Sequence, residues 1–263
     1  MKMNSNTILI TGGSSGIGLE LAKQFLALGN TVIITGRDAE KLRLAKARLP
    51  GVTAIQGDVG DPTAIQDLHR RVLADFPRLN LLVNNAGIMR NLDLNDSMVG
   101  LTDVVQEIAT NLSGPLQMVQ QFLPLLKSNQ PSAIVNVSSG LAFIPFAFSP
   151  VYGATKAAIH SYSQALRAQL RGTGIQVFEL APPATTTALM EAFGPGLASG
   201  HMNTAALVAA ALKGFGRNQT EILPGAAKAL KLMSRIAPKF FFNRLNNLFA
   251  RLLSQPEKMT VGK

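Results

Sequence analysis

Apolar positions along the chain follow two alternating patterns. Short runs rich in Val, Ile and Leu are typical of buried strands. They lie at residues 7–11, 31–35, 52–56, 79–83, 132–136, 176–180 and 221–223. Between them apolar residues recur every three or four positions, which predicts helices, the clearest at 19–28, 39–49, 62–75, 103–126 and 154–171. The alternation predicts an α/β fold, a doubly wound parallel β-sheet with helices on both faces.

The chain shows neither an internal repeat nor a low-complexity linker, so we expect one body and an extension. Residues 1–225 would hold the sheet, with 184–212 as a mobile lid, and 226–263 would form a helical tail packed on or beside that body. The lid is apolar at Leu189, Met190, Phe193, Leu197, Met202 and Leu207. These side chains would either surround a hydrophobic ligand or only pack the lid on the body.

A glycine-rich turn joins the first strand to the first helix, the context that dinucleotide binding requires. Its candidate contact residues are Gly12, Ser14, Ser15, Gly16, Ile17 and Gly18. Gly12 permits a tight turn, Gly16 lets the backbone approach a pyrophosphate, and Gly18 allows close packing of helix and strand. The free N–H groups and the positive dipole end of the helix favour phosphate there.

The ends of the second and third strands bear on the choice of nucleotide. Position 36 is where an acidic residue would bind the adenosine ribose of NAD, and here it is glycine. Arg37 follows and can form a bidentate pair with a 2′-phosphate, which predicts NADP(H) in preference to NAD(H). Alternatively, Arg37 only closes the loop and Asp38 binds the ribose. Asp58 and Val59 follow the third strand, and Asp58 would accept a hydrogen bond from adenine.

Asparagines and small residues follow the fourth strand, in the order Asn84, Asn85, Ala86 and Gly87. The asparagine side chains would fix the strand end by hydrogen bonds, and the small residues would let the backbone pass against a cofactor ribose. In the next helix, Gly114 and Pro115 should distort the backbone. Asn111, just before that distortion, would hold a water molecule there.

A serine, a tyrosine and a lysine lie around the end of the fifth strand and the helix after it. Ser139 follows the strand, and a spacing of four places Tyr152 and Lys156 on one helical face. A free tyrosine has a pKa of about 10. We expect the lysine ammonium to lower that pKa, which would make Tyr152 a general acid beside a serine that polarises a carbonyl oxygen.

Composition excludes several classes of site. The chain has 263 residues, 47% of them hydrophobic, and no cysteine, so disulfides and thiolate chemistry are excluded. The three histidines lie far apart, and we expect no metal site. The body carries no nucleic-acid-binding motif, so we expect no nucleic-acid partner. A polar N-terminus and the lack of an apolar run of about 20 residues predict a cytoplasmic protein.

Positive charge is concentrated in the tail. The formal net charge is +10, and residues 221–263 hold eight Lys/Arg and two Asp/Glu, a net charge of +6. We expect helices at 227–236 and 239–253, separated by Pro238. The second has an apolar stripe of Phe241, Leu245, Leu248, Phe249 and Leu252. Basic residues beside that stripe are compatible with a helix that covers the substrate cleft or a subunit interface, and also with membrane contact through 227–253.

Taken together, these motifs resemble the short-chain dehydrogenase/reductase family over about residues 7–225. The resemblance implies a Rossmann-like fold, a nicotinamide cofactor and hydride transfer between that cofactor and a carbonyl or secondary alcohol. It assigns catalysis to Asn111, Ser139, Tyr152 and Lys156. The tyrosine would give its proton to the carbonyl oxygen and the serine would orient that carbonyl. The lysine would lower the tyrosine pKa and bind the nicotinamide ribose, and the asparagine would hold a water in a proton relay.

One motif departs from the family pattern. The chain has Pro182 and Pro183 after the sixth strand, where the family usually has Pro-Gly. Because proline fixes φ near −65°, the loop beside the nicotinamide should differ. Pro182 and Thr187 remain candidates for cofactor contact, with Thr187 at the carboxamide. The Pro-Pro form resembles a bacterial branch of the family, the DltE-like oxidoreductases.

Three interpretations follow. The first is an NADP(H)-dependent enzyme whose small-molecule substrate is a hydrophobic or bulky carbonyl compound or alcohol. As similar proteins do, it would pair as a homodimer or homotetramer. The second is a catalytically silent NADP-binding protein that acts through protein contacts. The third is a membrane-surface protein that acts through its tail, peripheral on the inner membrane surface. The complete tetrad favours the first of these.

Overall fold

A computed structural model describes residues 1–94, 100–187 and 201–253. Seven strands form one sheet in the order β3-β2-β1-β4-β5-β6-β7, and every pair is parallel. The strands are β1 Thr7–Thr11, β2 Thr31–Gly36, β3 Val52–Gln56, β4 Leu79–Asn84, β5 Ser132–Val137, β6 Ile175–Leu180 and β7 Glu221–Ile222. The strand order reverses between β1 and β4, and such a switch point is where ligands bind at the carboxyl edge of a parallel sheet.

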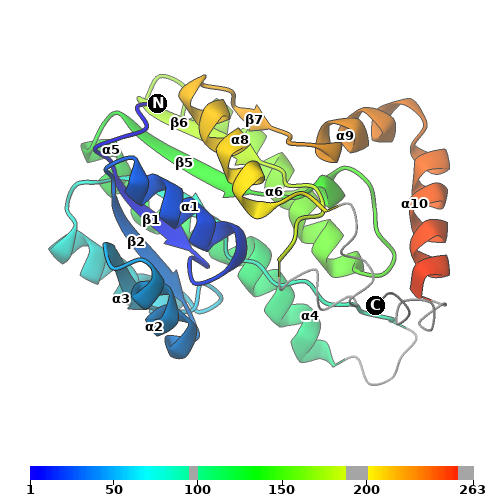
Figure 1. The fold of residues 1–263 in the computed structure, drawn as a ribbon, viewed down its shortest axis with the longest axis horizontal. Helices are drawn as coiled ribbons and strands as arrows, with labels where there is room; N and C mark the ends of the chain where they lie inside the picture. Colours follow the sequence, from blue (N-terminus) through cyan, green and yellow to red (C-terminus); the bar gives the residue numbers. More distant parts are fainter. Residues whose placement is uncertain (95–99, 188–200, 254–263) are drawn as a thin grey trace, which may run out of the picture.

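Helices cover both faces of this sheet (Figure 1). They are α1 Gly16–Ala27, α2 Ala39–Arg48, α3 Pro62–Asp75, α4 Leu101–Ile108, α5 Gly114–Ser128, α6 Pro150–Gln169, α8 Thr204–Gly216, α9 Ala226–Ile236 and α10 Pro238–Leu253. Helices α1, α2 and α8 pack on one face, and α3, α5 and α6 pack on the other. The predicted doubly wound, Rossmann-like architecture is therefore confirmed.

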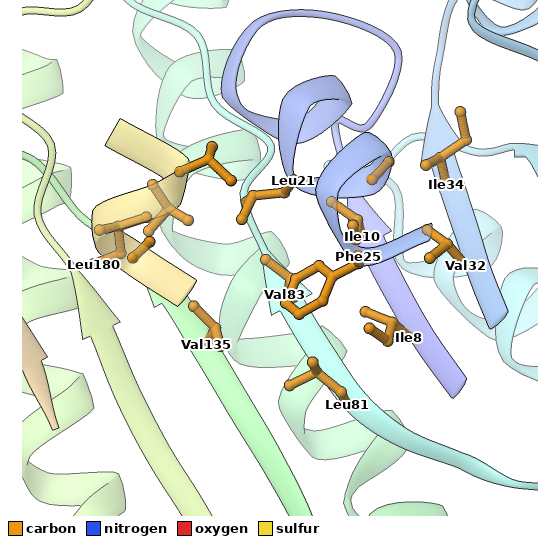
Figure 2. Close-up of a cluster of buried hydrophobic side chains, with 14 of the residues drawn as sticks. Ile8, Ile10, Leu21, Phe25, Val32, Ile34, Leu81, Val83, Val135 and Leu180 are labelled. Carbon is orange, nitrogen blue, oxygen red and sulfur yellow. The ribbon is translucent and has the colours of Figure 1, made fainter. Parts of the chain in front are cut away.

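Alternation along the strands builds two cores. Successive strand side chains point to opposite faces, so Ile8 and Ile10 belong to one core and Leu9 to the other. Figure 2 shows Leu21 and Phe25 of α1 lying over Ile8 and Ile10, and all of these side chains are fully buried. Burying one such side chain stabilises the fold by roughly 1.5–3 kcal/mol. These cores hold the carboxyl ends of the strands in fixed register.

The predicted distortion of the long helix at 103–126 is confirmed. The segment consists of α4, a π-helical turn at Ala109–Ser113 and α5. Proline has no N–H, so Pro115 cannot donate to the carbonyl of Asn111 four residues earlier. The irregular turn therefore lies at the asparagine that the sequence singled out.

The second half of the predicted lid forms a regular helix. Residues from Thr204 onward form α8, in which Leu207, Val208 and Phe215 are fully buried in the core that α1 also contributes to. Leu207 is therefore a core residue because it lies on the inner face of a regular helix. The predicted lid residues Leu189, Met190, Phe193 and Leu197 lie outside the described residues.

The tail forms the two helices expected, with the break at Ala237 and Pro238. Its apolar stripe divides, however. Leu245 and Phe249 pack on the body, whereas Leu248, at the edge of that helical face, is 52% exposed. None of the helices in the described part of the chain combines the length and hydropathy needed to cross a bilayer.

Candidate active site

The glycine-rich turn leaves a cradle at the switch point of the sheet. Gly12 and Gly16 have positive φ values of +64° and +53°, which glycine adopts without steric cost. A Cβ on Gly12 would lie 2.8 Å from the Cα of Ala86, and one on Gly18 would lie 2.3 Å from the carbonyl oxygen of Gly12. Both distances are too short for a real contact. Backbone thus approaches backbone where a nucleotide phosphate would lie.

Asparagines lock the neighbouring strand ends, as predicted. The Asn85 side chain donates to the carbonyl oxygens of Thr11 at 2.9 Å and Gly12 at 3.1 Å, and the Thr11 hydroxyl accepts from the main-chain N–H of Asn85 at 3.0 Å. One residue earlier, Asn84 donates to the side-chain oxygen of Asn136 at 2.9 Å. These bonds hold the ends of β1, β4 and β5 together beneath the cradle.

The loop after β2 presents one cation. Arg37 is exposed beside the cradle and forms no ion pair with any described carboxylate. Asp38 is the N-cap of α2, where its side chain accepts from the main-chain N–H of Lys41 at 3.0 Å. Asp58 lies across the cavity and accepts from the N–H of Gly60 at 2.8 Å. Asp38 is therefore already used in helix capping, which leaves Arg37 available to a ligand.

The predicted tetrad gathers at the inner end of the cradle. Tyr152, Lys156, Ser139 and Asn111 are all at most 9% exposed. A Cβ on Gly87 would lie 3.4 Å from the Lys156 Nζ and 3.5 Å from the Asn111 Oδ1, so both groups lie against the backbone of Gly87. The Ser139 hydroxyl caps a short 3-10 turn by accepting from the N–H of Leu141 at 3.1 Å.

Asn111 also positions the chain after β4. Its side chain accepts from the N–H of Ile88 and donates to the Ile88 carbonyl, both at 2.8 Å. It donates further to the Thr155 hydroxyl at 3.3 Å. The side chain therefore fixes the Gly87–Ile88 segment against α6.

Burial dominates the acid–base properties of this cluster. It raises the pKa of Tyr152 to about 12, although the Ser139 hydroxyl acts in the opposite direction. Burial also lowers the pKa of Lys156 to about 8. The expectation that Lys156 lowers the pKa of Tyr152 is therefore wrong. With the groups that the protein itself supplies, this pKa is raised. The ammonium lies 5.6 Å from the ring centroid of Tyr152 and donates to the carbonyl of Val137 at 2.9 Å.

A cavity of about 540 Å³ joins the cradle to the tetrad. Of the predicted site residues it is lined by Gly12, Ser14, Ser15, Gly16, Ile17, Arg37, Asp58, Val59, Asn85, Ala86, Gly87, Ser139, Tyr152, Lys156, Pro182 and Thr187. Gly18 packs beneath its floor and Asn111 lies behind Gly87, so neither lines it. The structure thus brings the sequence-predicted residues to one place, and their individual roles stay predictions.

The far end of the cavity is apolar, and the sequence did not assign most of its residues to the site. It is lined by Met89, Leu141, Phe146, Leu230, Leu245 and Phe249. The ring of Phe249 in α10 packs edge-on against Phe146, with centroids 4.7 Å apart, and Tyr152 adjoins the same cluster. The sequence feature that pointed to two of these residues was the four-residue spacing of Leu245 and Phe249. It places both on one face of α10, the face that lines the cavity.

Glu107 is a second feature that the sequence analysis missed. It lies on α4 one helical turn before Asn111 and is fully buried. Neither carboxylate oxygen forms a well-aligned hydrogen bond with the described residues, although the main-chain N–H of Arg90 lies near enough to lower the pKa of the carboxyl group. Burial raises its pKa to about 7, against the effect of Arg90, and its charge contributes to the high pKa of Tyr152. The only feature of the sequence that pointed to Glu107 was its position four residues before Asn111, which places both on the same helical face.

A polar network ties α9 to the sheet beside the site. Buried Glu179 accepts from the Ser138 hydroxyl at 2.5 Å and is bonded to the His160 Nδ1 at 2.8 Å. The ammonium of Lys231, on α9, pairs with Glu221 next to them. His160, Glu179 and Glu221 have a metal-like arrangement, but the lysine already neutralises part of its charge. We regard the network as an anchor for α9.

Known proteins resemble this chain in sequence and in fold. The family model described as short chain dehydrogenase matches residues 6–197. The Uncharacterized oxidoreductase DltE of Bacillus subtilis is 49% identical over 189 residues, which is 72% of this chain and 75% of that protein. A short-chain dehydrogenase from Sphingobium yanoikuyae in complex with NADPH has a TM-score of 0.77 and 28% identity, over 98% of this chain and 99% of that one.

A third relative was solved with the other nicotinamide cofactor. The 3-ketoacyl-(acyl-carrier-protein) reductase from Brucella melitensis, complexed with NADH, has a TM-score of 0.75 and 25% identity, over 83% of this chain and 94% of that one. The glycine cradle and the cavity fit such a dinucleotide. The chain therefore belongs to the short-chain dehydrogenase/reductase family, in its DltE-like branch, and is an oxidoreductase acting on CH–OH and C=O groups.

Proposed function

We propose that the enzyme is an NADP(H)-dependent reductase of hydrophobic carbonyl compounds, or a dehydrogenase of the matching alcohols. The cofactor would supply hydride when bound, and the cradle around Gly12 and Gly16 would hold its phosphates. The observation that carries the cofactor preference is the loop after β2. It combines Gly36, an exposed Arg37 without an ion pair to a described carboxylate, and an Asp38 that already caps α2.

In this proposal the chain's own residues provide the proton chemistry. Tyr152, held at the end of the cavity, gives its proton to the developing alkoxide oxygen. The Ser139 hydroxyl donates to that same oxygen and orients the carbonyl. Lys156 binds the nicotinamide ribose, and the π-helical turn at Asn111 holds a water molecule through which the proton on Tyr152 is replaced. In alcohol oxidation the same proton moves run in reverse.

The apolar end of the cavity supports a hydrophobic substrate. Phe146, Leu245 and Phe249 would surround the part of the molecule that does not react. Each buried CH₂ contributes about 0.8 kcal/mol, or up to roughly fourfold in kcat/KM. A series of methyl ketones of increasing chain length should therefore show rising kcat/KM until the cavity is filled. A flat series would contradict a hydrophobic pocket.

The experiment for the cofactor preference is a fluorescence titration of NADPH and NADH. A charge-assisted pair contributes roughly 1.5–3 kcal/mol, so Arg37→Ala should weaken NADPH binding ~10–150-fold and leave NADH binding unchanged. Gly36→Asp should reverse the preference, because a Cβ there meets no atom closer than 3.4 Å. Arg43→Ala is the matched control, since Arg43 lies on α2, the helix that follows this loop, and pairs with Glu40. Equal dissociation constants for both cofactors in the wild type would refute the proposal.

We also propose that two copies of the chain associate and that the tail contacts a membrane. Leu101, Val105 and Ile108 of α4 are 86%, 64% and 38% exposed and lie on one helical face, as an interface with a second copy would require. Sedimentation of a Val105→Asp variant tests this association.

The basic excess in the tail, residues 227–253 above all, supports peripheral contact with the inner membrane surface.

A further inference from the structure

The tail helices have an inner face that closes the active-site cavity. Leu230 of α9 and Leu245 and Phe249 of α10 line its apolar end. Asn246 accepts from the N–H of Ala147 at 2.7 Å and donates to the carbonyl of Pro145 at 3.3 Å, which fixes α10 against the loop before α6. The inner face is therefore a built wall of the substrate site.

The outer face of the same two helices is apolar and basic. Leu232, Ile236, Phe240 and Leu248 are 60%, 71%, 59% and 52% exposed. The basic side chains between them, all exposed, are Lys228, Arg235, Lys239 and Arg244. Residues 222–253 contain no Asp or Glu, and none of these four cations pairs with a described carboxylate. We call these eight residues the outer tail surface.

The place of these helices leaves this surface open. Figure 1 shows α10 at the edge of the molecule, beyond α9 and away from the sheet. The anchoring of α9 uses Lys231, which turns inward to Glu221, so the four outer cations are not needed for that purpose. Exposed large apolar residues grouped in this way mark an interaction site.

Charge identifies the kind of partner. In a symmetric contact with a second copy, the outer tail surface would meet itself, which would bring eight cations together without a carboxylate in residues 222–253 to compensate them. The rest of the chain offers no large opposite charge, since residues 1–220 hold seventeen Lys/Arg and thirteen Asp/Glu. An anionic bilayer complements both properties, because its headgroups attract the cations and its acyl region accepts the apolar side chains.

We propose that the outer tail surface docks on an anionic bilayer and seats the apolar end of the cavity at the lipid. The substrate is then an apolar carbonyl compound dissolved in the membrane, which reaches the cavity past α10. This second part rests on the proposed reductase function, whereas docking on lipid does not. The same helix pair thus serves as the wall of the site and as its membrane contact.

Vesicle co-sedimentation of the full chain tests the docking. The wild type should bind vesicles of phosphatidylglycerol and phosphatidylcholine but not of phosphatidylcholine alone, and binding should weaken with salt. Each basic residue near an anionic surface contributes about fivefold, so Lys239→Glu/Arg244→Glu should weaken binding by at least about 30-fold. Arg78→Glu/Arg171→Glu changes the net charge equally at loops before β4 and β6, and it should bind like the wild type.

Three results would overturn the docking. The wild type could ignore anionic vesicles at low salt, or the control variant could lose binding as much as the tail variant, which would mean attraction by net charge alone. Finally, the wild type could self-associate without binding vesicles. If the Leu232→Ser variant then lost that self-association, the outer tail surface would be an interface between copies.

A paired rate measurement tests the delivery of substrate. NADPH oxidation is followed with a long-chain methyl ketone in the anionic vesicles and with a short, water-soluble ketone. The tail variant should lose about 30-fold on the vesicle ketone at limiting lipid and keep its rate on the soluble one. Equal losses on both would refute a docking role for Lys239 and Arg244. If neither ketone is reduced while vesicle binding persists, the proposed reductase function fails and the docking stands.

Discussion

Replacing Glu107 by glutamine should remove much of the pH dependence of the protein's stability. The side chain is fully buried on α4, its oxygens form no well-aligned hydrogen bond with the described residues, and its pKa is raised to about 7. Glutamine has nearly the shape of the protonated acid. The substitution therefore keeps the packing beside Tyr152 and removes the charge that burial penalises.

The sign and size of the effect follow from the raised pKa. A carboxyl group with a pKa of 4.5 in the unfolded chain and about 7 in the folded protein binds its proton more tightly when folded. Its contribution is fully present below about pH 4.5 and is lost as the pH rises through 7. The whole shift corresponds to roughly 3 kcal/mol. Relaxation around the buried charge should reduce the observed loss to about 2 kcal/mol.

Urea denaturation at pH 5 and pH 8 measures this effect. The wild type should lose about 2 kcal/mol of unfolding free energy between these pH values beyond the change seen in Glu107→Gln. The two proteins should be about equally stable at pH 5. Glu40→Gln, an exposed glutamate on α2 that pairs with Arg43, serves as the control and should keep the wild-type decline. Identical pH profiles for the wild type and Glu107→Gln would refute the argument.

Three further outcomes are expected. Tyr152→Phe should lower turnover by ~10²–10⁴-fold and leave cofactor binding intact, as measured by steady-state rates and cofactor fluorescence. Gly18→Ala should cost roughly 1–3 kcal/mol in urea denaturation and weaken cofactor binding, since its Cβ would lie 2.3 Å from the Gly12 carbonyl oxygen. In Tyr162→Phe, which leaves one of the chain's two tyrosines, ultraviolet titration should show no phenol ionising below about pH 11.

Much of the fold could be predicted because its elements are local and strongly patterned. The buried strands, the Gly12–Gly18 turn and the break at Pro238 each depend on residues within a few positions of one another. Helix α6 begins at Pro150, four residues before the start that the apolar pattern predicts. Proline is suited to the first turn of a helix, where its missing N–H removes no bond, and apolar periodicity does not include this signal.

The candidate site was predictable where its residues lie at strand ends. In a parallel sheet those ends meet at one edge, so Gly12, Asp58, Asn85 and Ser139 had to converge once the alternation of strands and helices was recognised. The apolar wall was not predictable in this way. Leu245 and Phe249 reach the cavity only because α9 is anchored by Lys231 and α10 turns back over the body, which depends on tertiary packing rather than on local pattern.

The electrostatics of the tetrad show the same limit of sequence reasoning. Spacing places Lys156 one turn after Tyr152, but burial decides what the pair does. Burial raises the pKa of Tyr152 to about 12, and the Lys156 ammonium donates to the Val137 carbonyl. Lowering that tyrosine pKa to near 8 would require roughly 5 kcal/mol of preferential stabilisation of the phenolate. The described protein groups do not supply it, so the phenol is held neutral until charge enters the cavity beside it.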